Sequence, residues 1–95
     1  MNLSEEQLQL IKEYASNLMT WREIAILLDI PCDLLTEEFM DENSAASKYY
    51  LKGKTETLLQ LRSSLVENAR RGSPQSEALV LELINLQRIN ETDIL

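Results

Sequence analysis

The sequence predicts an all-α fold, in which an N-terminal unit of three short helices is followed by a long antiparallel helical hairpin. Apolar side chains recur at steps of three and four residues along most of the 95-residue chain. Only two glycines and two prolines interrupt these segments. At 44% hydrophobic and 26% charged residues, the composition is that of a globular protein, and the length suits one small domain with a helical arm.

The first unit is placed at residues 1–43. Its three helices are predicted over residues 5–17, 21–28 and 32–40. Ser4 and Thr20 each begin a capping box, in which the hydroxyl caps the helix and a Gln or Glu three residues later bonds back. Pro31 separates the second helix from the third, because proline cannot continue a helix but suits the first turn of the next one.

The second unit, residues 44–95, is predicted to hold two longer helices, over 45–71 and 74–89. Gly72 suits the end of the first, and Gly53 within it is expected to permit close approach of another helix. The last helix is apolar around most of its circumference, so a single neighbouring helix cannot cover it. We therefore expect a homo-oligomer, with an interface that comprises Leu58, Leu61, Leu65, Leu79, Leu83 and Leu86.

Charge is distributed unevenly along the chain, which has a net charge of -7. Residues 44–72 are basic, whereas the segments on either side of them are acidic. The basic residues of this middle segment are Lys48, Lys52, Lys54, Arg62, Arg70 and Arg71. The overall acidity argues against a general nucleic-acid binder, so any DNA contact is expected to involve this segment.

Catalytic and metal-binding signatures are missing from the sequence. It contains no histidine, which excludes a histidine-based triad and histidine-liganded metals, and Cys32 is the single cysteine. No glycine-rich phosphate loop is present either. We expect a protein that is not an enzyme and that uses no cofactor and no metal. The start of the chain has no secretory pattern and no long apolar run occurs, which predicts a cytoplasmic protein without a membrane partner.

The segment from Thr20 to Leu35 resembles a helix-turn-helix. Ala25 is small at the point where the two helices must cross, and the short turn before Pro31 suits a near-perpendicular crossing. The apolar residues expected in the core of this unit are Ile24, Leu28, Ile30 and Leu35.

Most of the chain, from residue 4 to 88, resembles phage small terminase subunits and related prophage helix-turn-helix proteins. The resemblance is carried by Tyr49-Tyr50-Leu51-Lys52-Gly53-Lys54 and by the corner Ala69-Arg70-Arg71-Gly72-Ser73-Pro74. It implies a non-catalytic protein of the bacterial host cytoplasm that recognises viral double-stranded DNA for packaging. It also implies assembly through the hairpins and a large terminase subunit as partner.

The predicted reading helix departs from this pattern, because its expected outer positions are Asp33, Thr36, Glu37 and Glu38. Carboxylates repel phosphates, whose neutralisation supplies much of the affinity for DNA. The candidate DNA-binding residues are Arg22, Asp33, Thr36, Glu37, Lys48, Lys52, Lys54 and Arg62, of which the lysines are the strongest.

A second function stays open at the level of sequence. It is an acidic all-helical protein-interaction or regulatory module that does not bind DNA and docks a partner on its apolar last helix. The lysines would then form a solvated face, paired with Glu56 and the acidic N-terminal region. Duplex binding that weakens steeply with salt distinguishes the first function from the second.

Overall fold

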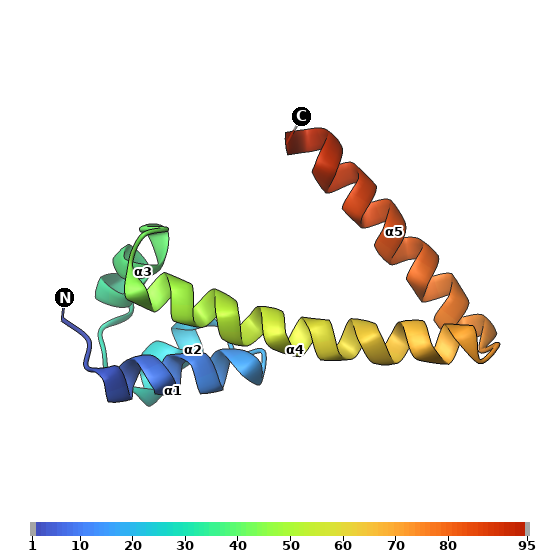
Figure 1. Ribbon diagram of the computed structural model, residues 1–95. Helices are drawn as coiled ribbons and strands as arrows, with labels where there is room; N and C mark the ends of the chain where they lie inside the picture. The colour runs from blue at the N-terminus through green and yellow to red at the C-terminus, as the bar shows by residue number, and fades with distance from the viewer. Residues whose placement is uncertain (1, 95) are drawn as a thin grey trace. The chain divides into compact units, whose positions relative to one another are not determined.

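The computed structural model describes residues 2–94, with side chains as far as Ile89, and the described chain is helical without any strand. The five helices in Figure 1 are α1 (Glu5–Ser16), α2 (Trp21–Leu27), α3 (Cys32–Met40), α4 (Ala45–Arg70) and α5 (Pro74–Ile94). The predicted all-α fold is confirmed, and α5 continues beyond the predicted end at residue 89. The chain forms two compact units, one that ends at Leu58 and one that begins at Leu59, so α4 contributes to both.

The two predicted capping boxes are present at the starts of α1 and α2. The Ser4 hydroxyl accepts a hydrogen bond from the Gln7 amide at 3.1 Å, and the Gln7 side chain accepts one from the Ser4 amide at 2.9 Å. Thr20 and Glu23 repeat both bonds, at 3.3 and 2.9 Å. The bonds that Thr20 donates lower the pKa of the Glu23 carboxyl, since they favour its charged form.

Three of the helices end in the same motif, with one left-handed residue after the helix. These residues are Leu18 (φ 61°), Asp29 (φ 55°) and Gly72 (φ 91°). In α1 the Met19 amide returns to the Tyr14 carbonyl at 3.3 Å, and equivalent bonds close α2 and α4. Glycine adopts this conformation freely, whereas a leucine there is strained.

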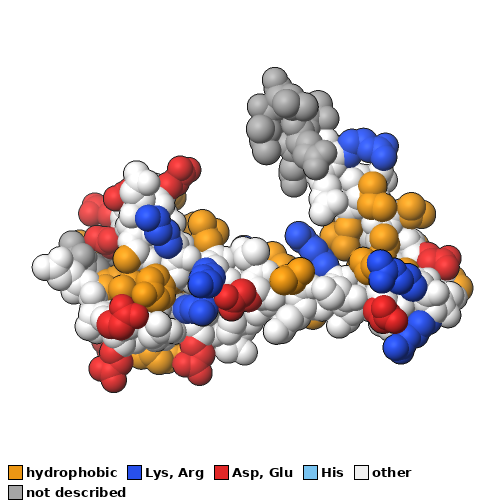
Figure 2. Space-filling model, in the orientation of Figure 1, with side chains coloured by type: hydrophobic (Ala, Val, Ile, Leu, Met, Phe, Trp, Pro, Cys, Tyr) orange, Lys and Arg blue, Asp and Glu red, His pale blue; other side chains and the backbone are white. Residues whose placement is uncertain are grey.

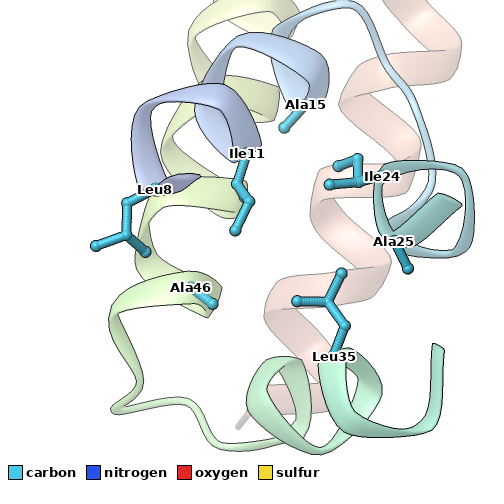
Figure 3. Packing of buried hydrophobic residues seen from close by; sticks show 7 residues of the cluster. All are labelled: Leu8, Ile11, Ala15, Ile24, Ala25, Leu35 and Ala46. Atoms are coloured by element: carbon cyan, nitrogen blue, oxygen red, sulfur yellow. The ribbon is translucent and has the colours of Figure 1, made fainter. Parts of the chain in front are cut away.

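The core of the first unit comprises seven buried apolar residues from four helices: Leu8, Ile11, Ala15, Ile24, Ala25, Leu35 and Ala46. Ile11, Ile24 and Leu35, one from each of α1, α2 and α3, are fully buried and point toward one another (Figure 3). Of the core residues predicted from the turn pattern, Ile24 and Leu35 are buried, while Leu28 and Ile30 are partly buried and pack against the cluster.

The first half of α4 packs closely on α1. A Cβ atom at Gly53 would overlap the backbone carbonyl oxygen of Lys12, which confirms that this glycine permits close helix approach. The Thr57 hydroxyl also donates to the Ser16 carbonyl at 2.6 Å. These contacts fix the first half of α4 to α1.

Aromatic side chains join α2, α3 and α4. The ring centroids of Trp21, Phe39 and Tyr50 lie 5.1 to 6.1 Å from one another in tilted or edge-on arrangements. Such pairs stabilise a fold beyond the area that they bury. The cluster therefore packs α4 against α2 and α3 at Tyr50.

The second unit comprises the rest of α4 and α5, joined by the tight turn at Gly72 into a helical hairpin. Among its described side chains, none of the apolar ones is buried, and Leu65, Val66 and Leu83 are half-buried. The large apolar residues left exposed are Leu59, Leu61, Leu79, Leu81, Ile84, Leu86 and Ile89. No described helix has the length and apolarity needed to cross a membrane.

Candidate nucleic-acid interface

The segment from α2 to α3 consists of two short helices joined by a tight turn. The left-handed Asp29 ends α2, and the Ile30 amide bonds to the Ala25 carbonyl at 3.0 Å, which turns the chain within four residues. Ala25 is 1% exposed at the packing of the two helices. A small residue at this position and a tight turn together set the crossing of α2 and α3.

The outer face of α3 combines acidic and apolar side chains. Asp33 and Glu37 are exposed, and Leu34 between them is 47% exposed. Thr36 and Glu38, expected on the outer face, are half-buried, and the Thr36 hydroxyl lies 3.8 Å from the Cys32 sulfur. Side chains that read DNA offer positive charge or hydrogen-bond donors, so this face is poorly suited to phosphates.

The candidate basic residues of the first unit do not form one surface. Lys48 and Lys52 lie one turn apart on α4, whereas Lys54 lies near the Tyr50 ring, with its Nζ 6.0 Å from the ring centroid. Arg22 is exposed on α2, and Arg62 belongs to the second unit. On the visible face in Figure 2, basic side chains are interspersed with acidic ones.

Lys48 and Lys52 line a shallow hollow of about 250 Å³ between α1 and α4, together with Gln9, Lys12 and Tyr49. We call this feature the α1–α4 hollow. Lys12 was not a candidate from the sequence, where it lies in the acidic segment before residue 44. The available signal was Gly53, which directly follows Lys52: a glycine that lets α1 approach α4 also brings a lysine of α1 near the lysines of α4.

Two carboxylates border the α1–α4 hollow, and both have partners. Glu56 lies 3.8 Å from the Lys12 ammonium. Glu5 accepts hydrogen bonds from the Tyr49 hydroxyl at 3.0 Å and from the Gln9 amide at 3.1 Å. The bond to Glu5 raises the pKa of Tyr49, because it stabilises the protonated phenol. The three lysines that line the hollow outnumber these two carboxylates by one, so the hollow keeps a net positive charge.

The predicted oligomer interface is incompletely covered by its own chain. Leu58, Leu65 and Leu83 are half-buried, whereas Leu61, Leu79 and Leu86 are 47 to 56% exposed.

Within the described part of the chain, no three Cys, Asp or Glu side chains are grouped so that they could hold a metal ion.

Comparisons with protein-family models, with curated proteins and with solved structures give no match for this chain. The resemblance to small terminase subunits therefore stays a prediction from the residues that carry it.

Proposed function

We propose that this chain is a non-catalytic protein that binds double-stranded DNA as a homo-oligomer, in the role of a small terminase subunit in viral DNA packaging. The observation that carries the proposal is the pairing of a folded N-terminal unit of short helices with a hairpin whose described apolar side chains are left uncovered. A large terminase subunit is the further partner that this role requires. The location is then the cytoplasm of the bacterial host.

Self-association is supported by the exposed apolar side chains of the second unit. Burying a half-exposed Leu or Ile contributes about 1 kcal/mol. The seven such residues on each of two copies then contribute on the order of 10 kcal/mol, comparable to the cost of association. An uncovered surface of this kind marks an interaction site in a folded protein.

Charge favours a second copy as the occupant of this surface. From Leu59 to Arg71, α4 and its turn carry three arginines and one glutamate, whereas α5 has four acidic residues and one arginine. In a two-fold pair, the α5 helix of each copy can lie against α4 of the other, because the same two surfaces meet twice. Opposite charges then face each other across both halves of the interface.

DNA binding is supported by the helix-turn-helix architecture and by the lysines of α4. Each chain offers few basic contacts, so a single copy binds duplex weakly. An oligomer presents several copies of the same contacts, and this raises the effective concentration of each one near the DNA.

A second candidate function, docking of a protein partner on α3, is favoured by the outer face of that helix. Leu34 is 47% exposed on a helix that also exposes Asp33 and Glu37, and Met40 at the end of the helix is 70% exposed. A basic amphipathic segment of another protein matches such a face better than phosphates do.

The test combines mass and duplex binding on the full chain. Sedimentation is expected to give a multiple of the 10.9 kDa chain, and electrophoretic mobility shifts are expected to show duplex binding that weakens steeply between about 50 and 200 mM salt. The double variant Leu79→Gln/Leu86→Gln is expected to lower both the mass and the affinity.

The matched control is Ile26→Gln, which replaces a residue 70% exposed in the first unit and is expected to keep the mass of the wild type. A chain that stays at monomer mass at all concentrations contradicts the oligomer. A chain that binds no duplex at low salt contradicts DNA binding and leaves the protein-docking function.

A further inference from the structure

The α1–α4 hollow collects three lysines from two helices. Lys12 comes from α1, where it is half-buried, and Lys48 and Lys52 are exposed on α4. Among the described side chains, neither Lys48 nor Lys52 has an ion-pair partner. Like charges four residues apart on a helix repel each other by a few tenths of a kcal/mol. The fold therefore maintains an uncompensated positive charge at this position.

The acidic groups beside the hollow do not cancel that charge. Glu56 is paired with Lys12, and Glu5 is held by Tyr49 and Gln9 at its border. Three ammonium groups thus face two carboxylates in a chain that is acidic overall. A local excess of positive charge in an acidic protein points to an anionic ligand.

The spacing of these lysines suits a backbone of phosphates. Lys48 and Lys52 stand about 6 Å apart along the helix axis, so they are able to reach separate phosphates. Lysine binds phosphate as a point charge with a flexible stem, which positions a duplex without reading its sequence. The acidic α3 face offers no comparable charge.

We propose that the α1–α4 hollow binds the phosphate backbone of duplex DNA through Lys12, Lys48 and Lys52, so that α1 and α4 face the DNA in place of α3. This inference rests on the proposed DNA binding and identifies its contact surface. Gly53 and the bond from Thr57 to Ser16 hold α4 against α1, so the three lysines are positioned before DNA arrives.

The test measures duplex binding of the full-length triple variant Lys12→Gln/Lys48→Gln/Lys52→Gln against a random-sequence duplex over a range of salt. Each lost phosphate contact removes about 0.9 from the slope of log K against log salt, so the slope is expected to fall by about 2 to 3. At physiological salt, affinity is expected to fall at least about tenfold. Circular dichroism checks that the variant stays helical.

Two further variants separate the α1–α4 surface from other surfaces. Lys52→Gln and Lys54→Gln remove the same charge two residues apart, about 200° around the helix, and Lys52→Gln is expected to weaken binding more. Neutralising α3 with Asp33→Asn/Glu37→Gln is expected to change the affinity less than Glu5→Gln, which removes a carboxylate from the border of the hollow and is expected to tighten binding.

The outcomes distinguish this inference from the proposal on which it rests. If the wild type binds no duplex at low salt, the proposed DNA binding fails, and the inference fails with it. If the wild type binds and the triple variant keeps the wild-type slope, only the inference is overturned. The inference is also overturned if Asp33→Asn/Glu37→Gln strengthens binding more than Glu5→Gln does.

Discussion

The two units of the chain differ in how far their apolar residues are buried and in their net charge. The unit that ends at Leu58 contains all seven buried apolar residues of the described chain and has five basic and eleven acidic residues. The unit that begins at Leu59 has four basic and five acidic residues, and its large apolar side chains, as far as Ile89, are exposed or half-buried. High net charge keeps one copy of a surface away from another, and a nearly neutral apolar surface does not. The first unit is therefore stabilised by its own buried core, whereas the second exposes apolar surface that another copy can cover.

The largest expected effect compares one leucine in each unit. Leu35→Ala empties a fully buried site and is expected to lower the free energy of unfolding by about 2 to 5 kcal/mol. Leu81→Ala, at a site that is 62% exposed, is expected to cost less than about 0.5 kcal/mol in the monomer. Urea denaturation at low protein concentration measures both. Equal losses in the free energy of unfolding would mean that the hairpin is packed by its own chain, and the two units would then not differ in this respect.

Gly53→Ala tests the contact that joins α4 to α1. The added methyl group overlaps backbone, which cannot rotate away, so we expect a loss of about 1 to 3 kcal/mol although alanine is the better helix former. Thr55→Ala, at an exposed position of the same helix, is the control and is expected to be neutral or slightly stabilising. A stabilised Gly53→Ala variant would show that α4 does not approach α1 this closely.

Leu18→Gly is expected to stabilise the first unit. Relief of the left-handed strain is worth about 1 to 2 kcal/mol, and the extra freedom of glycine in the unfolded chain offsets part of it. The net gain is expected to be at most about 1 kcal/mol, read from the urea midpoint. Asp29→Gly is expected to gain less, because aspartate tolerates this conformation better than leucine does.

The smallest effect concerns acid stability at the start of α2. The pKa of Glu23 is lowered from 4.5 in the folded chain by the bonds from Thr20, so its contribution is present above the unfolded pKa. That contribution is lost as the pH falls through the folded pKa. The stability difference between the wild type and Glu23→Gln is therefore expected to shrink from neutral pH to about pH 3. A stability difference between the two proteins that is constant with pH would show that Glu23 does not stabilise the fold in this way.

The sequence was sufficient for the helices because their signals are local. Capping hydroxyls at Ser4 and Thr20, the proline at 31 and the glycine at 72 act within one turn of the chain, and each does in the structure what its chemistry predicts. The long-range features were harder to predict. Lys12 lies beside Lys48 and Lys52 because Gly53, forty-one residues later, has no Cβ and so lets α4 approach α1. The periodicity of apolar residues along the sequence does not predict such a contact.

The outer face of α3 shows the same limit at shorter range. Asp33 and Glu37 are exposed as their spacing suggests, but Thr36 turns toward Cys32 and is half-buried. Spacing around a helix identifies a face, and the neighbouring elements decide how wide the exposed part of that face is.

The aromatic residues of this protein have a practical consequence. All five, among them the single tryptophan Trp21, precede Leu59, and three of them form the cluster of Trp21, Phe39 and Tyr50. Intrinsic fluorescence and near-ultraviolet absorption therefore observe the first unit alone, and the hairpin gives no signal in either. A melt followed at the same time by tryptophan emission and by total helicity resolves, in one unlabelled sample, whether the two ends of α4 unravel together.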